Sequence, residues 1–170
     1  MKRILLLVLF CSVYLPLRAQ IRQLTIASDP AMRYGKVGVV VLSGDRVVVV
    51  YQAIAKDGGR SDIYAALVEG EKVTQVGNIS DSSARSLEPD VAVSSSGTVH
   101  FAWFDDKGGG VYDLRYRTIS GTTPSSIVTL GTVRANEGVE DLRLAADASD
   151  NAAVVWMNWE SGGALCYMAT

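Results

Sequence analysis

The chain repeats one pattern three times, and this repetition constrains its fold more than any other feature. A strong apolar run closes on an aromatic residue at Tyr51, again at Trp103 and again at Trp156, at intervals of 52 and 53 residues. Self-similarity at a fixed period of about 50 residues is typical of architectures built from repeated supersecondary units. We therefore expect three copies of one unit that stack on each other.

Each repeat carries the same landmarks in the same order. An apolar strand and a turn precede the aromatic run, and an acidic, glycine-rich loop and another strand follow it. The turns are 43–45, 95–97 and 149–151, the acidic loops are 57–59, 105–110 and 160–163, and fourth strands are expected at 72–79 and 126–133. Sixteen glycines against four prolines fit a turn-rich β chain.

Four antiparallel strands in about 50 residues are the content of one propeller blade. The apolar segments 39–42 and 47–50 do not alternate with polar residues, so we expect these inner strands to be covered on both faces. No segment shows a convincing helical period. The predicted fold class is all-β: a β-propeller-type array of three four-stranded antiparallel blades, half or a fragment of a six-bladed propeller.

The blades are expected at approximately 36–80, 88–133 and 138–170. The third stops after three strands, and the N-terminal stretch 21–27 belongs to no blade, so we expect it to complete the last one and leave no open edge. Propellers typically have about four to eight blades. Three blades indicate either a homodimer that closes a six-bladed ring or a truncated part of a longer product.

Residues 1–19 have the layout of a secretory signal peptide. Lys2 and Arg3 precede an apolar run over 4–10, and Ala19 provides a small residue for cleavage before Gln20. The run is short of the roughly 20 apolar residues that a spanning helix needs. We expect a secreted or periplasmic domain over 20–170, with no membrane attachment after cleavage.

Cleavage leaves an anionic domain. Loss of Lys2, Arg3 and Arg18 reduces the basic residues from 16 to 13 against 18 acidic ones, which gives a net charge of −5. Nucleic acid repels such a chain, so we exclude it as a partner. Cys166 is the one remaining cysteine, so the domain has no intrachain disulfide.

The second repeat resembles a known family. Residues 88–105, EPDVAVSSSGTVHFAWFD, followed by YDLRY at 112–116, are similar to a blade of the sialidase-like (BNR-repeat-like) six-bladed propellers of secreted bacterial proteins. The resemblance covers roughly 21–170 and implies the fold, not an activity. The family's Asp-box pattern, Ser-x-Asp-x-Gly-x-Thr-Trp, has no full match, and the Arg-Ile-Pro tripeptide of sialidases is absent from 33–37. No catalytic residue is carried over.

Six residues form the candidate binding site. Acidic residues precede two inner strands near the expected mouth of the central channel, an arginine interrupts an apolar strand where it is suited to gripping a carboxylate, and a non-repeated tryptophan is suited to stacking on a sugar. The six are Glu88, Asp90, Glu140, Asp141, Arg143 and Trp159. The alternatives are that Arg143 pairs with a neighbouring acid in a wet channel and that Trp159 packs within its loop.

The remaining polar landmarks have structural explanations. His100 is the only histidine, which excludes a multi-histidine zinc site, and we expect it to be packed or hydrogen-bonded. Asp62 and Asp113 recur before the third strand, which indicates a turn role. We expect no metal and no cofactor.

Together these features predict a recognition module that binds a glycan or a protein partner without catalysis of its own. One alternative is a fragment of a sialidase-like glycoside hydrolase whose other site residues lie on further blades. Another is a truncated propeller with no independent function.

Overall fold

The computed structural model describes residues 23–121, 123–159 and 164–169, and within them the chain is all-β. The expected signal peptide and the acidic loop at 160–163 lie outside the described residues. The strands form three antiparallel sheets, and the described part of the chain contains no helix. The all-β, antiparallel prediction is therefore confirmed.

The three sheets follow one another along the chain. The first sheet has the order β1 (Met32–Val41), β2 (Arg46–Ala55), β3 (Ser61–Glu69) and β4 (Lys72–Asn78). The second contains β5 (Arg85–Val93), β6 (Val99–Gly108), β7 (Val111–Ser120), the short β8 (Thr123–Pro124) and β9 (Val128–Arg134), of which β8 and β9 both pair with β7. The third contains β10 (Val139–Ala146), β11 (Ala152–Asn158) and β12 (Ala164–Ala169).

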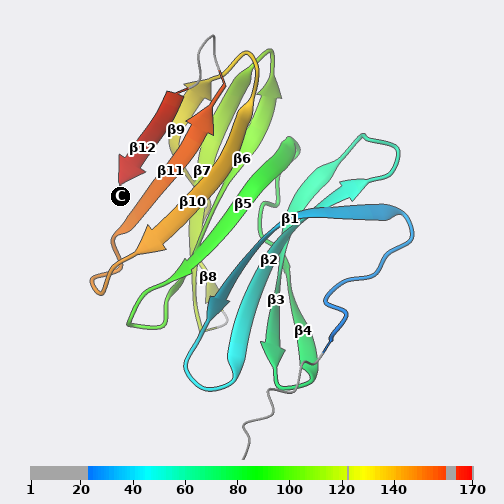
Figure 1. The fold of residues 1–170 in the computed structure, drawn as a ribbon, viewed down its shortest axis with the longest axis vertical. Coiled ribbons are helices and arrows are strands. Elements are labelled where there is room, and N and C mark those ends of the chain that lie inside the picture. The colour runs from blue at the N-terminus through cyan, green and yellow to red at the C-terminus, as the bar shows by residue number, and fades with distance from the viewer. Residues whose placement is uncertain (1–22, 122, 160–163, 170) are drawn as a thin grey trace, which may run out of the picture.

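The second sheet lies between the other two, and both of its faces are buried. Phe101 and Trp103 on one face of β6 pack with Val50 of the first sheet. Ala102 and Phe104 on the other face belong to a separate cluster that also contains residues of the third sheet. Figure 1 shows the resulting stack, with the first strands β1, β5 and β10 side by side. β6 is thus buried on both faces over most of its length.

The same backbone irregularity recurs in all three first strands. Lys36, Glu88 and Asp141 have positive φ angles of 35°, 53° and 50°, at intervals of 52 and 53 residues. Each lies where the pairing of the first strand with the second shifts register, which is the geometry of a β-bulge. The repeat in the sequence is therefore also a repeat in the backbone.

One face of β1 differs from the expectation of burial on both faces. Val37, Val39 and Val41 are 66%, 60% and 68% exposed, so the prediction for 39–42 is wrong. Apolar residues allow a strand to be buried on both faces, but burial also requires a neighbouring sheet. Among the described residues, the first sheet has a neighbouring sheet on one face.

The N-terminal stretch also lies elsewhere than expected. Residues 23–29 form no strand, and Gln75 Nε2 on β4 donates a hydrogen bond to the carbonyl oxygen of Ile26 at 2.7 Å. Ile26 and Ala27 pack on Tyr51 at the outer face of the first sheet. The described part of 21–27 therefore does not complete the third sheet, because the apolar outer face of the first sheet attracts it instead.

Candidate functional site

Two of the six expected site residues hold neighbouring sheets together. Glu88 Oε2 accepts a hydrogen bond from the backbone N of Asp141 at 2.9 Å, and Asp90 Oδ2 accepts one from the backbone N of Leu144 at 2.8 Å. Both donors belong to β10, the edge strand of the third sheet. Carboxylates that satisfy edge amides in this way tie the sheets and protect the edge.

A lysine completes this connection on the other side. Lys36 Nζ of β1 lies 3.1 Å from Glu88 Oε1. Glu88, itself buried, therefore touches both neighbouring first strands at their bulges. Each oxygen of its carboxylate therefore has a partner within the chain.

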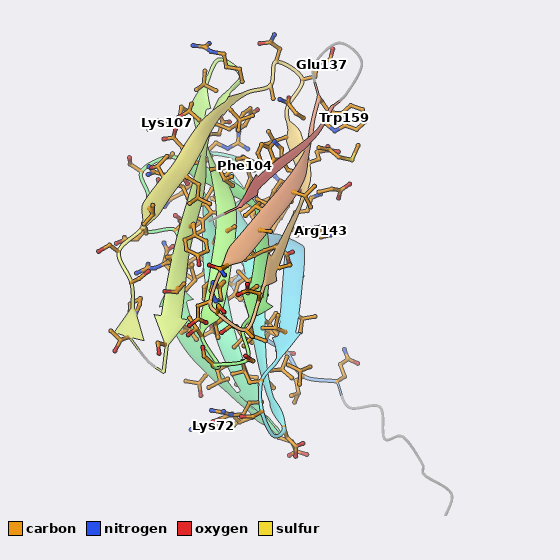
Figure 2. All side chains as sticks on the ribbon, turned by 90° about the vertical axis from the view of Figure 1, so that its left-hand side faces the viewer. Lys72, Phe104, Lys107, Glu137, Arg143 and Trp159 are labelled. Atoms are coloured by element: carbon orange, nitrogen blue, oxygen red, sulfur yellow. The ribbon has the colours of Figure 1, made fainter. Side chains whose placement is uncertain are left out.

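The other four expected residues pair locally near the surface. Trp159 Nε1 donates to Glu140 Oε2 at 3.2 Å, and Arg143 Nη2 lies 3.8 Å from Asp141 Oδ1. The Arg143 side chain is 67% exposed. Figure 2 shows Trp159 towards the end of the sheets that carries Glu137, with Arg143 further along the third sheet. Arg143 therefore follows the alternative of pairing with an adjacent acid.

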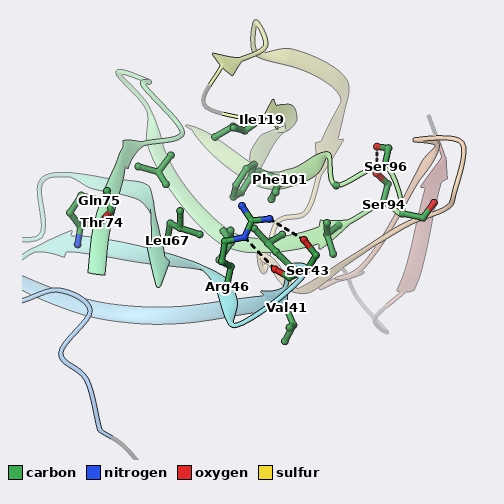
Figure 3. Close-up of a pocket in the computed structure, with 18 residues that line it drawn as sticks. Val41, Ser43, Arg46, Leu67, Thr74, Gln75, Ser94, Ser96, Phe101 and Ile119 are labelled. Atoms are coloured by element: carbon green, nitrogen blue, oxygen red, sulfur yellow. Dashed lines mark hydrogen bonds between the residues drawn. The ribbon is translucent and has the colours of Figure 1, made fainter. Parts of the chain in front are cut away.

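A cavity lies elsewhere, between the first and second sheets. It is a cleft of about 630 Å³, within the usual range for ligand sites. Its apolar walls are Val48, Leu67, Val93, Val99, Phe101 and Ile119. None of the six expected residues lines it. Residues of the β1–β2 and β5–β6 turns, among them Ser43 and Ser96, line one part of the cleft (Figure 3).

A cation and a series of hydroxyl groups lie at the mouth of this cleft. Arg46 Nε donates to the carbonyl oxygen of Ser43 at 3.2 Å, and its Nη2 donates to Ser43 Oγ at 3.0 Å. These bonds fix the guanidinium over the cleft and leave other N–H donors for an anion. Among the described residues, no carboxylate pairs with Arg46. Ser94, Ser95, Ser96 and Thr74 supply the hydroxyl groups.

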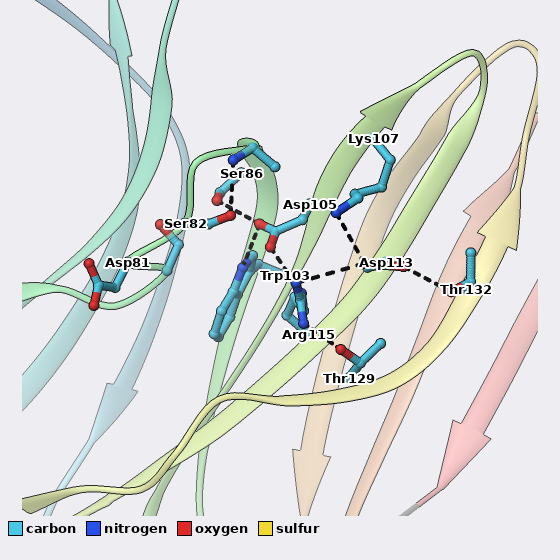
Figure 4. Close-up of polar contacts among 12 residues, drawn as sticks. Asp81, Ser82, Ser86, Trp103, Asp105, Lys107, Asp113, Arg115, Thr129 and Thr132 are labelled. Carbon is cyan, nitrogen blue, oxygen red and sulfur yellow. Dashed lines mark hydrogen bonds and ion pairs between the residues drawn. The ribbon is translucent and has the colours of Figure 1, made fainter.

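A second, smaller cavity is polar. It has a volume of about 280 Å³ and is lined in part by Asp81, Asp105 and Arg115. Asp105 is buried and accepts hydrogen bonds from Ser86 Oγ at 2.7 Å, Trp103 Nε1 at 3.1 Å and Arg115 Nε at 3.0 Å (Figure 4). Three donors bind this carboxylate, so it anchors the second sheet.

His100 lies in a third polar group at the turn end of the second sheet. Its Nδ1 lies 2.6 Å from Tyr116 Oη, and its Nε2 lies 3.7 Å from Asp150 Oδ1. Burial lowers the pKa of His100 despite the nearby Asp150, while hydrogen bonds from Ser94 and Ser96 lower the pKa of Asp150. The packed, hydrogen-bonded histidine expected from the sequence is confirmed.

The recurring aspartates lie within strands β3 and β7 and not in turns, so the expected turn role is wrong, although both have structural contacts. Asp62 is buried and pairs with Arg60 Nε at 2.6 Å. Asp113 lies 3.7 Å from Arg115 Nη2 and accepts a hydrogen bond from Thr132. Both bind neighbouring side chains of their own sheets.

In the described residues, no group of three or more His, Cys, Asp or Glu side chains is placed to hold a metal ion. A search for helices long and apolar enough to cross a membrane finds none in the same residues.

The cleft was missed from the sequence because its walls come from different repeats. Arg46 precedes a uniformly apolar run, and the serines at 94–96 form a turn before Gly97. Neither segment carries a recognisable motif by itself. Only the stacking of two sheets brings them to one opening.

Comparison with known proteins adds no family assignment, since no family model and no curated protein matches the chain.

Proposed function

We propose that the three sheets are blades of a six-bladed, sialidase-like propeller, as the resemblance of residues 88–116 implies. Face-to-face stacking and the recurrence of the bulge at Lys36, Glu88 and Asp141 support this proposal. The chain would then act at the cell exterior, after loss of residues 1–19.

The function proposed for this module is non-catalytic recognition of a protein partner, with the cleft between the first two sheets as its binding site. The observation that carries this proposal is the combination of an apolar interior with a fixed cation at its mouth, in Arg46. An apolar side chain of the partner fills the interior, and a neighbouring carboxylate pairs with the guanidinium.

A peptide segment fits this cleft better than a glycan. Aliphatic walls such as Leu67 and Val48 offer nothing to sugar hydroxyl groups, whereas they bury an apolar side chain well. Thr74, Gln75 and Val76 line the cleft from β4, an edge strand of the first sheet. Edge strands accept extended peptides through backbone hydrogen bonds.

The contacts of the acidic residues argue against hydrolysis by this chain alone. Most glycoside hydrolases need two carboxyl groups that act on the substrate, and the sialidase type needs an acid beside a tyrosine nucleophile. Glu88 and Asp90 instead accept backbone amide hydrogens of β10, and Asp105 accepts three internal donors. These groups are engaged in holding the sheets.

Selection from a random peptide library on the immobilised chain tests this function. We expect enrichment of peptides with a bulky apolar residue close to Asp or Glu. Leu67→Trp, which fills the cleft, and Arg46→Glu, which reverses its charge, should each reduce binding at least tenfold, whereas the control Arg143→Glu should not. Enrichment without that pattern, binding unaffected by both cleft variants, or binding to a glycan array in place of peptides would overturn the proposal.

A further inference from the structure

The stack of sheets has a direction. We call the face of each sheet that points towards the preceding sheet its upstream face, and the opposite face its downstream face. The aromatic landmark of every repeat lies on the upstream face, and the small residue immediately before it lies on the downstream face. Trp103 of the second sheet thus packs with Val50 of the first, and Trp156 of the third packs with Ala102 of the second.

Among the described residues no sheet precedes the first one, so its upstream face lies against no other sheet there. Val39 occupies the position of Val91 in the second sheet, 52 residues later. Val91 is 4% exposed because the first sheet covers it, whereas Val39 is 60% exposed. With Val37 and Val41 it forms an apolar row along β1. This row is equivalent to a buried interface elsewhere in the same chain.

No sheet follows the third one within the part of the chain that the structure describes, so its downstream face is the counterpart of that upstream face. Its small apolar residues are Ala145, Ala153 and Val155, and Val155 occupies the position of Val50 and Ala102. Arg143 stands on the same face and is exposed. In both interfaces within the chain, the downstream residue just before the landmark, Val50 or Ala102, belongs to the same cluster as the upstream aromatic of the next sheet. Val155 is the equivalent residue of the third sheet and would lie against Tyr51 of a following first sheet.

The polar contacts that join successive sheets are also complementary at the two ends. Inside the chain, the Glu88 carboxylate binds the bulge amide of Asp141 in the next sheet. Asp141 is the counterpart of Glu88, and its side chain is 54% exposed. The bulge that would follow it is that of Lys36, whose ammonium group lies 3.1 Å from Glu88 Oε1 of its own chain, so the group left for Asp141 is the backbone amide of Lys36.

We propose that a second copy of this chain places its third sheet on the first sheet of this one, and reciprocally, so that two chains close a ring of six sheets. This inference rests on the proposed blade arrangement but not on the cleft, which lies within one chain. Two identical head-to-tail contacts that close on themselves give a symmetric dimer without open ends. The incoming sheet displaces Ile26 and Ala27, which cover Tyr51 in the single chain.

Cysteine cross-linking tests the contact at one position. Within the chain, Val91 lies close to Gly38 across the first interface. The equivalent pair across the proposed contact is Val39 with Arg143 of the second copy, and both side chains are exposed in the single chain. The double variant Val39→Cys with Arg143→Cys should form a covalent dimer under mild oxidation. Each single variant should not, and neither should the control Val39→Cys with Val128→Cys.

Light scattering of the purified chain supplies the second measurement. We expect twice the mass of one chain, and we expect the mass of one chain for Val39→Asp. Val128→Asp, at an exposed valine outside both open faces, should remain a dimer. A monomeric wild-type chain, a ladder of larger species, or a dimer that Val39→Asp leaves intact and the cysteine pair fails to trap would overturn the proposal. Peptide binding in the cleft would survive each of these outcomes.

Discussion

Glu88 accepts a hydrogen bond from the backbone of Asp141, the residue that occupies its own position one repeat later. The two lie on adjacent first strands, at bulges with nearly the same φ angle. The repeat thus places equivalent residues next to each other in space, and successive sheets are joined through them. The stack is held at its first strands by this contact as well as by the apolar clusters.

Replacing Glu88 should therefore weaken the folded state. Glu88→Ala removes the acceptor for the Asp141 amide and the partner of Lys36, with an expected loss of about 1–3 kcal/mol in the free energy of unfolding. Glu88→Gln keeps an amide oxygen as acceptor and should lose less. Urea denaturation measures both, with the exposed Glu140→Ala as the matched control near zero. Equal effects at Glu88 and Glu140 would refute this role.

The close approach of β1 and β5 at Gly38 makes a steric prediction. A Cβ at Gly38 would lie 2.8 Å from Asp90 Oδ1 and 2.9 Å from Val50 Cγ1, whereas a Cβ at Gly35 meets nothing within 4 Å. Gly38→Ala should lower the free energy of unfolding by about 1–3 kcal/mol. Gly35→Ala on the same strand should not lower it. Thermal denaturation of the two variants compares them directly, and a tolerated Gly38→Ala would contradict the packing.

Asp105 should be intolerant of even an isosteric change. Asp105→Asn removes the charge that faces Arg115 and turns an amide group towards donors, and breaking such a buried pair typically costs about 3–5 kcal/mol. Asp106→Asn is the neighbouring control, because its side-chain oxygen still accepts the hydrogen bond from Gly108. Chemical denaturation should separate the two variants clearly. Similar small losses at both would show that Asp105 is not an anchor.

The burial of His100 should make the free energy of unfolding depend on pH. Burial lowers its pKa in the folded chain below the value of about 6.5 expected when unfolded. As the pH falls through 6.5, the unfolded chain binds a proton first, so the free energy of unfolding should decrease between pH 7.5 and 5.5. Asp150 and Asp147 face the ring, and their own lowered pKa values place their titration at lower pH.

His100→Gln is the control for this pH dependence of the free energy of unfolding. The variant lacks the titrating ring, so its stability should vary less with pH over the same interval. Urea unfolding at several pH values measures both proteins. A wild-type stability that rises towards pH 5.5 would mean that protonated His100 pairs favourably with Asp150, contrary to the prediction.

Much of the fold can be predicted from the period and the apolar runs. The interval between Tyr51, Trp103 and Trp156 locates three β units, and the structure contains three antiparallel sheets at those places. The exposure of Val39 cannot be predicted in the same way, because it depends on which sheet lies beside it. The bulges cannot be predicted from the sequence either. Lys36, Glu88 and Asp141 are not glycines, so their residue types do not indicate a positive φ angle.

The candidate site is harder to predict, for a related reason. Acidic residues before a strand fit a channel mouth as well as they fit a contact between sheets, and only the hydrogen bonds of Glu88 and Asp90 distinguish the two. Arg46 and Phe101 lie 55 residues apart in the sequence and meet only because their sheets stack. Arg143 and Trp159, by contrast, find partners within their own repeat.

The most direct measurement is an NMR titration of the isotopically labelled chain with a peptide from the library selection. We expect the chemical-shift changes to concentrate at Arg46, Leu67, Ser95 and Phe101, on both walls of the cleft. Changes concentrated instead at Glu140, Arg143 and Trp159, with the cleft unaffected, would refute the proposed cleft and place the binding site on the third sheet.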